Sequence, residues 1–310
     1  MSREVSNELL ELYEHWGHGL KKVAVGYSIL GIDKTRLKEV QDFAALRMKA
    51  WESRQLGIYP TYDDQIISKF KFCNVYRELD RQTIYFHSKL KYLIDDFDKW
   101  LLNMFVARFL ANSETFERVG MIEVGVEAVF ALKTLKTMPK PKFGNAYVFP
   151  ISTIINSPWP NREEFIFKYV PLAIREVALI IQNQKGSSVN GLLNLILPAF
   201  KFNHRFLWTE VLIDVHYQFP NLVNLDTDFH IGPGAKPSLE YLSSGDTQGL
   251  GGFLDNLAAK YPYINDVNLE VEGRRVPLSA ENWEGICCEF RKYQNLKSGK
   301  GRRRLYKPIG

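Results

Sequence analysis

The densest group of polar side chains within an apolar stretch of this chain lies at positions 70–81. On a helix, Asn74, Arg77 and Arg81 would share one face at spacings of three and four, with Asp80 beside Arg77. Such a face could bind a phosphate or a polar base, although an exposed network of weak ion pairs would give the same pattern. The candidate residues for this phosphate or base pocket are Asp64, Phe72, Asn74, Tyr76, Arg77, Asp80 and Arg81.

A second group combines two carboxylates with a glycine turn. Asp226 and Asp228 lie two positions apart, so in an extended segment their side chains point the same way. A carboxylate held at such a turn could stabilise a developing positive charge or activate a nucleophile. Helix capping would use the same residue type at the same place. Both interpretations of Asp226 and Asp228 stay open.

Several motifs that would define other chemistries do not occur. The turn at 232–235 lacks the spacing of a P-loop, and neither a P-loop, a G-x-S-x-G elbow nor an H-E-x-x-H pair occurs elsewhere. The three cysteines (Cys73, Cys287 and Cys288) form no C-x-x-C, and the six histidines complete no zinc spacing. We therefore expect reduced thiols, no metal and no cofactor.

Mostly helical elements are expected to position these groups. The segment 34–55 shows a clear 3.6-residue apolar period, and 279–293 begins with Ser279 as a helix N-cap. A short hairpin is expected at 267–276 and β-like runs at 145–155. The other expected helices are 7–16, 63–72 and 74–93 (two helices or one bent helix), 100–110, 124–135, 162–182, 191–197, 206–217 and 249–260. The pattern predicts a mainly α protein with minor β-hairpins and two helical lobes, 1–135 and 136–310.

Composition limits the class of protein. The 310 residues are 45% hydrophobic and 24% charged, which is typical of a folded protein and excludes a collagen-like fibre or a disulfide scaffold. No apolar stretch approaches the length that crosses a bilayer. The first eight residues include two acidic side chains where a signal peptide would have a basic start and then an apolar run. We expect a cytoplasmic monomer without a membrane partner.

Charge is concentrated at the end of the chain. The last twenty residues hold eight basic and no acidic side chains, and the rest of the chain is slightly acidic. A basic tail with interleaved glycines could bind nucleic-acid phosphates, or it could be a solvated terminus. The expected DNA-backbone contacts are Lys201, His204, Arg205, Lys292, Tyr293, Arg302, Arg303 and Arg304.

Three segments together resemble a known family. They are Asp63-Asp-Gln-Ile-Ile with the 70–81 segment, Asp228-Phe-His-Ile-Gly-Pro-Gly-Ala, and Cys288-Glu-Phe-Arg-Lys-Tyr. They resemble the helical domain of 5-hydroxymethyluracil DNA kinases and of their relatives, the α-glutamyl/putrescinyl thymine pyrophosphorylases, or amino acid:DNA transferases. The resemblance covers roughly residues 40–305, and the kinase module of the kinase members is missing from this chain.

That family is similar to a branch of the helix-hairpin-helix DNA glycosylases, which implies that fold here. Leu197-Pro198, a helix to position 217 and then Asp226 follow the order seen in such glycosylases. By position Asp226 matches their catalytic aspartate, whereas by the family motif Asp228 does. The hairpin glycines are absent, because positions 199–201 read Ala-Phe-Lys, so charge from Lys201, His204 or Arg205 would have to replace them.

The resemblance implies modified DNA as the partner and leaves three functions open. We expect first a DNA glycosylase that flips out and excises a 5-hydroxymethyl-pyrimidine derivative, as in defence against phages. The alternative is a transferase that joins an amino acid or polyamine to phosphorylated 5-hydroxymethyluracil in DNA and displaces pyrophosphate. The third possibility is a non-catalytic reader of modified DNA. Under the first expectation, Asp226 or Asp228 would be catalytic.

Overall fold

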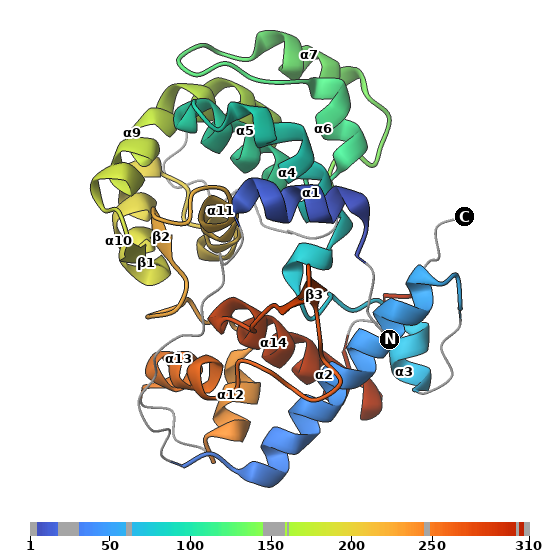
Figure 1. The fold of residues 1–310 in the computed structure, drawn as a ribbon. Coiled ribbons are helices and arrows are strands. Elements are labelled where there is room, and N and C mark those ends of the chain that lie inside the picture. Colours follow the sequence, from blue (N-terminus) through green and yellow to red (C-terminus); the bar gives the residue numbers. More distant parts are fainter. Residues whose placement is uncertain are drawn as a thin grey trace. The chain divides into compact units, whose positions relative to one another are not determined.

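The structure is a computed structural model, and it describes residues 5–17, 31–59, 64–144, 159, 161–244, 249–301 and 304–306. Helices make up most of this part of the chain, with four short strands between them (Figure 1). The expectation of a mainly α protein is confirmed. The helix-hairpin-helix arrangement stays a prediction.

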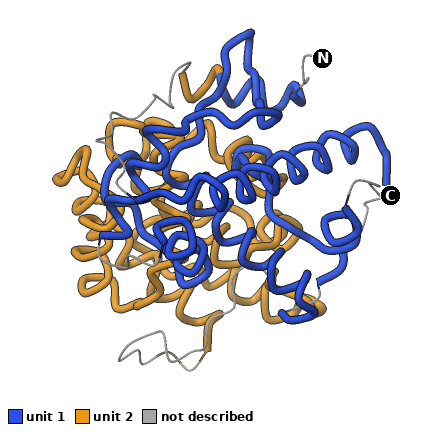
Figure 2. Tube along the Cα trace, turned by 90° about the horizontal axis from the view of Figure 1, so that it is seen from below, with its two compact units in different colours: residues 1–13, 18–80, 225–310 blue, residues 14–17, 81–224 orange. Residues whose placement is uncertain are grey.

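Contacts divide the chain into two compact units (Figure 2). Unit 1 comprises residues 1–13, 18–80 and 225–310, and unit 2 comprises residues 14–17 and 81–224. Unit 1 is thus built from both ends of the chain, and unit 2 from its middle. This division differs from the lobes expected at 1–135 and 136–310, which stay a prediction about folding units. A pattern of apolar residues identifies helices but not which distant helices pack together.

Unit 1 is organised around its last helix, α14 (Ala280–Lys297). As expected, the helix starts at Ser279, whose backbone N–H donates to Asn282 Oδ1 at 3.0 Å. Helices α2, α3, α12 and α13 pack against it (Figure 1). Their bounds are Lys34–Gln55, Gln65–Lys69, Lys236–Leu242 and Leu250–Lys260. Strands β3 (Glu270–Val271) and β4 (Arg274–Arg275) form the expected antiparallel hairpin.

Aromatic side chains form the core between α2, the segment at 72 and α14. The Phe43 ring lies 5.1 Å from Tyr293, 5.8 Å from Phe290 and 5.9 Å from Phe72, centroid to centroid. All four are buried. Burial of one such side chain stabilises a fold by about 1.5–3 kcal/mol. The core therefore fixes the segment at 72 against α14.

Unit 2 surrounds α5 (Phe97–Leu110), which is buried along most of its length. Its other helical elements are α4 (Arg81–Leu90), η2 (Lys91–Leu93), α6 (Ser113–Val119), α7 (Val129–Thr137), α8 (Arg162–Glu164), η4 (Phe165–Tyr169), α9 (Val170–Asn183), α10 (Val189–Phe200) and α11 (Arg205–Gln218). Strands β1 (Ser187–Ser188) and β2 (Val223–Asn224) pair in parallel. Helix α1 (Asn7–Trp16) has residues in both units.

Four expectations about elements need correction or fall outside the description, and two helices were not expected. The helix expected at 63–72 shortens to α3, and the one at 74–93 divides into η1 (Arg77–Leu79), α4 and η2. Pro198 does not open a helix, because it lies in the last turn of α10 and the chain turns after it, at 201–204. Helices α6 and α12 have seven residues each, too few for the pattern to predict them. The β-like runs at 145–155 lie outside the described residues.

Candidate functional site

Every residue of the Cys-Glu-Phe-Arg-Lys-Tyr motif at the centre of α14 packs against or bonds to another part of unit 1. Cys288 and Arg291 meet the glycine turn at 232–234. Glu289, Lys292 and Tyr293 bond to the segment at 64–73. Phe290 lies in the core. The three segments that carry the family resemblance therefore meet on one helix, which makes this region the candidate site.

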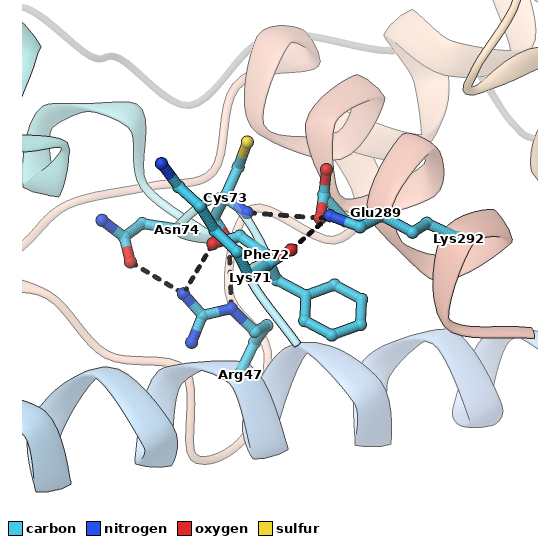
Figure 3. Close-up of polar contacts among 7 residues, drawn as sticks. All are labelled: Arg47, Lys71, Phe72, Cys73, Asn74, Glu289 and Lys292. Atoms are coloured by element: carbon cyan, nitrogen blue, oxygen red, sulfur yellow. Dashed lines mark hydrogen bonds and ion pairs between the residues drawn. The ribbon is translucent and has the colours of Figure 1, made fainter. Parts of the chain in front are cut away.

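A buried arginine holds the segment 72–74. The Arg47 side chain of α2 is 2% exposed, and its guanidinium donates to Cys73 O at 3.0 Å, Phe72 O at 3.4 Å and Asn74 Oδ1 at 2.9 Å (Figure 3). Burial, with Arg54 nearby, lowers the pKa of Arg47 to about 10. At neutral pH this guanidinium is still charged.

The contacts of Arg47 explain why the expected helix over 74–93 begins late. The carbonyls of residues 72 and 73 point to the buried Arg47 guanidinium and accept from it, which stabilises a non-helical backbone at these positions. The backbone of 71–74 has no helical assignment, and α4 begins only at Arg81. The expectation that Asn74, Arg77 and Arg81 share a helical face is therefore wrong. Arg81 belongs to unit 2 and Asn74 to unit 1.

Asn74 links Arg47 to the end of this segment. Its Nδ2 donates to Asp80 Oδ1 at 2.8 Å and to Leu79 O at 3.0 Å, while its Oδ1 accepts from Arg47. Both N–H donors of the amide are thus used within unit 1. In this structure Asn74 and Asp80 shape the loop, and their expected role in a base or phosphate pocket stays a prediction.

Glu289 and Lys292 fix the other edge of the segment. Glu289 Oε2 accepts from the Cys73 N–H at 3.2 Å and from Lys292 Nζ at 3.0 Å (Figure 3). Lys292 Nζ also donates to Lys71 O and lies 4.5 Å from the centroid of the Phe72 ring. The Glu289 carboxylate raises the pKa of the Cys73 thiol well above its ordinary value. Cys73 is therefore a poor nucleophile at neutral pH.

Asp64 has two structural partners. Its Oδ1 accepts the N–H groups of Ile66 and Ile67 at 2.8 and 2.9 Å and so caps α3. Its Oδ2 accepts from the Tyr293 hydroxyl at 2.7 Å. Burial and this carboxylate raise the pKa of Tyr293 to about 12. Asp64 and Tyr293, expected at separate sites, therefore form one contact.

The glycine turn fits closely against α14. The Gly232 N–H donates to Glu284 Oε1 at 3.0 Å, and Arg291 Nη1 donates to Pro233 O at 2.7 Å. A Cβ on Gly234 would overlap Cys288 Sγ, and one on Gly232 would lie 2.9 Å from Glu284 Oε1. The close approach of α14 thus favours glycine at position 234, whereas a side chain at position 232 would require the Glu284 carboxylate to move.

The candidate catalytic aspartates lie near a third carboxylate. The Asp228 N–H donates to Asp255 Oδ2 at 2.7 Å, and Asp228 has a φ of 49°, in the left-handed region that Asp tolerates. Burial raises the pKa of Asp255, and the nearby carboxylates of Asp228 and Asp226 raise it further. Unit 1 therefore gathers negative charge at the start of the family's Asp-Phe-x-x-Gly-Pro-Gly-Ala segment.

Other residues expected at the site lie elsewhere or are buried. Tyr76 is fully buried and donates to Val276 O at 3.1 Å. In unit 2, Lys201 ends α10, His204 Nδ1 accepts from the Leu207 N–H at 3.0 Å and caps α11, and Arg205 donates to Asn194 Oδ1 at 2.8 Å. Phe72 is buried and Arg77 half-buried in unit 1.

The basic tail is only partly described. Arg302 and Arg303 lie outside the described residues. Arg304 is exposed, and its carbonyl accepts from the Lys71 N–H at 2.9 Å. The expected contacts of these arginines with DNA stay predictions.

Sequence reasoning missed Arg47, Glu289, Arg291 and Asp255. For Arg47 a signal exists, because the apolar period of α2 places position 47 on the buried face with Phe43 and Ala44. A cation at a core position requires partners inside the fold. Nothing in the local pattern distinguishes Asp255 from an ordinary polar residue of a helix.

The fold and the site define a mainly helical protein in which three motif segments meet on one helix. A family model described as "5-hmdU DNA kinase, helical domain" matches residues 34–303, and this chain belongs to that family. A 5-hmdU DNA kinase of Bacillus phage SP10 is 26% identical over 268 residues, which cover 76% of this chain and 41% of the relative. The chain thus spans less than half of that relative's length. No solved structure matches.

These findings correct the expected chemistry. The matching family and relative bear the name of a kinase, which transfers a phosphoryl group, whereas a glycosylase hydrolyses an N-glycosidic bond. The expectation of a DNA glycosylase, and hence of a hydrolase, is therefore wrong, and the transferase alternative fits better. In the described part of the chain, no helix has the length and hydropathy needed to cross a membrane.

Proposed function

We propose that this protein is a transferase that acts on 5-hydroxymethyl pyrimidines in DNA and joins an amino acid or polyamine to the base. The observation that carries the proposal is the meeting of the family's motif segments on α14, with carboxylates and cations in the same unit. The family match over residues 34–303 supports the substrate class. To reach its target, the enzyme must extrude the nucleotide from the base stack.

In the proposed reaction the substrate base carries a pyrophosphate ester on its 5-hydroxymethyl group. The amine nitrogen attacks the methylene carbon, the carbon–oxygen bond to pyrophosphate breaks, and a carbon–nitrogen bond forms. The amine loses one proton, and pyrophosphate leaves with the bonding electron pair. The glycosidic bond stays intact, which distinguishes this reaction from base excision.

The charges of unit 1 suit both partners of this reaction. The carboxylates of Asp226, Asp228 and Asp255 can bind an ammonium group and take up the proton that it must lose before its nitrogen attacks, in addition to the proton released when the carbon–nitrogen bond forms. Arg291 is exposed and uses one N–H on Pro233 O, which leaves its other donors for phosphate oxygens. Asp255 and Arg291 both bond to the same short segment at 228–235.

The test is mass spectrometry of nucleosides after the protein is incubated with DNA that carries pyrophosphorylated 5-hydroxymethyluracil. With a mixture of amino acids and polyamines, we expect a mass gain that depends on the amine, together with release of pyrophosphate. Asp228→Asn and Asp226→Asn should reduce the gain. Nucleosides of unchanged mass with every amine would refute the amine transfer.

A second candidate follows from the name of the relative, a 5-hmdU DNA kinase. In this second candidate function, the chain binds the modified DNA so that a phosphoryl group can be transferred to the 5-hydroxymethyl group. The sequence has no P-loop, so a separate segment or polypeptide would hold ATP. The same assay with ATP and unphosphorylated 5-hydroxymethyluracil DNA detects this candidate as an added phosphate. Tight binding of modified DNA without any mass change would instead indicate a reader.

A further inference from the structure

The segment after α14 returns to pair with the segment after α3. The Lys71 N–H donates to Arg304 O at 2.9 Å, the Tyr306 N–H donates to Lys69 O at 3.0 Å, and Phe70 and Leu305 form an antiparallel bridge between them. Side chains alternate along paired segments. Lys71, Arg304 and Tyr306 therefore project from one face. Lys69, the last residue of α3, adjoins them, and its Nζ lies 5.7 Å from the centroid of the Phe70 ring.

This pairing holds like charges together. Lys71 lies across the bridge from Arg304, and such pairs of like charges destabilise a sheet. Within the described ranges, no carboxylate forms an ion pair with Lys69 or Lys71, and both lysines are exposed. An anion bound on this face would relieve the repulsion. Phosphate groups of a nucleic acid fit that requirement.

Two tyrosines adjoin the same face. The Tyr59 and Tyr306 rings lie 5.0 Å apart, and the Arg54 guanidinium lies 3.6 Å from the centroid of Tyr306. Arg54 also donates to Ile67 O at 3.0 Å, which fixes the guanidinium against α3. Tyr59 is 38% exposed. The face thus combines preorganised aromatic rings with cations.

We propose that this surface, formed by Arg54, Tyr59, Lys69, Lys71, Arg304 and Tyr306 and here named the tail strip, binds a single-stranded stretch of DNA. Ring faces stack on unpaired bases, while cations follow the backbone, and this combination is typical of single-strand binding. A duplex buries its base faces and would use the cations alone. The inference rests on the proposed function, because extrusion of the target nucleotide leaves the base opposite to it unpaired.

The first experiment measures binding of the whole chain to a labelled oligothymidine of about 12 nucleotides, within the usual site size. Fluorescence anisotropy should show Tyr306→Ala weakening Kd by about tenfold, the loss expected for one stacked base. Tyr306→Phe keeps the ring and should bind like the unaltered protein. Tyr92→Ala, which removes a 62% exposed tyrosine of unit 2, is the matched control.

The second experiment separates the contribution of the cations to DNA binding from that of the aromatic rings. The slope of log K against log salt should fall by about 0.7 for Lys69→Ala and for Lys71→Ala, because each removes one phosphate contact to a single strand. The slope should not change for Tyr306→Ala or for Lys133→Ala, an exposed lysine of unit 2. If Tyr306→Ala and Lys71→Ala bind as their controls do, or if duplex binds better than single strand, the proposal is wrong.

A third measurement needs no variant that could misfold. Acetylation of lysines in the unaltered protein, followed by peptide mass spectrometry, should show that oligothymidine protects Lys69 and Lys71 but not Lys133. Equal labelling with and without DNA would overturn the proposal. Because the oligonucleotide is unmodified, these results do not depend on transferase activity. These experiments can therefore refute DNA binding by the tail strip while the transferase proposal holds, and the transferase proposal can be refuted while DNA binding by the tail strip holds.

Discussion

The two units each contain a buried arginine within a polar network, and the networks differ in what surrounds them. In unit 2, Asp214 accepts from Arg108 Nε at 2.6 Å and lies 3.0 Å from His87 Nε2, and all three side chains are at most 4% exposed. In unit 1, Arg47 is equally buried, but its network extends through Asn74 to Asp80, which is half-buried.

The difference separates a structural network from one that can serve a site. Arg108 pairs with a carboxylate on a neighbouring helix, so its charge is balanced inside the core. Arg47 bonds instead to backbone carbonyls and an amide, and among the residues that the structure describes no carboxylate forms an ion pair with it. A buried cation that shapes a loop beside a motif helix is therefore a better indication of function than a buried ion pair.

Breaking the unit 2 network should have the largest effect on stability. Asp214→Ala leaves the buried charge of Arg108 without its carboxylate, and we expect a loss of about 3–5 kcal/mol in the free energy of unfolding. Urea denaturation followed by circular dichroism measures this loss. The control is Asp42→Ala, which removes an exposed pair with Lys38 and should cost less than about 0.5 kcal/mol. Equal losses for Asp214→Ala and Asp42→Ala would show that the buried network stabilises the protein no more than an exposed ion pair does.

Breaking the unit 1 network should lower the free energy of unfolding less than breaking the unit 2 network does, but it should weaken DNA binding more. Arg47→Met fills the space with an apolar chain and leaves the carbonyls of residues 72 and 73 without their donor, a loss of about 2–4 kcal/mol. Because the loop then loses its conformation, affinity for DNA should fall as well. Asp214→Ala, assayed at a temperature where it is still folded, should bind DNA normally. Loss of binding in both variants would remove the distinction between the networks.

The sequence predicts this fold well where one helix has one apolar face. The bounds of α1 and α2 agree with the predicted ranges, and Ser279 with Asn282 marks the start of α14. The expected hairpin at 267–276 contains β3 and β4. In these places, local spacing and capping residues suffice, because they show which face of the helix is buried and where the helix begins.

The candidate site could be predicted only in part. The motif segments identify Asp64, Lys292 and Tyr293, but not the bond between Asp64 and Tyr293, which are 229 positions apart. The segment 70–81 has helical spacing, yet Arg47 binds the carbonyls of residues 72 and 73, and the backbone of 71–74 is not helical. Such long-range competition for backbone groups leaves no local pattern, so the helical face was wrongly predicted.

A smaller effect should come from the glycine turn, where unit 1 is packed most closely. Gly234→Ala places a methyl group against Cys288 Sγ, and we expect a loss of about 1–3 kcal/mol. Gly251→Ala in α13 meets no atom within 4 Å and should leave stability unchanged or raise it by up to about 1 kcal/mol. Cys288→Ala should recover part of the loss in the double variant, and simple additivity would argue against this contact.

The smallest effect on stability should come from substitution of Tyr293, and its dependence on pH identifies the hydroxyl as the cause. Tyr293→Phe removes the hydrogen bond to Asp64, a loss of about 1 kcal/mol at neutral pH. The folded state raises the pKa of Tyr293 from its ordinary value of 10.0 to about 12, so folding favours the protonated hydroxyl. This contribution is fully present below pH 10 and is lost as the pH rises through about 12. The stability difference between the unaltered protein and Tyr293→Phe should therefore shrink across that range in urea denaturation. A constant difference would show that Tyr293 does not titrate differently on folding, and the contact with Asp64 would then be no more than packing.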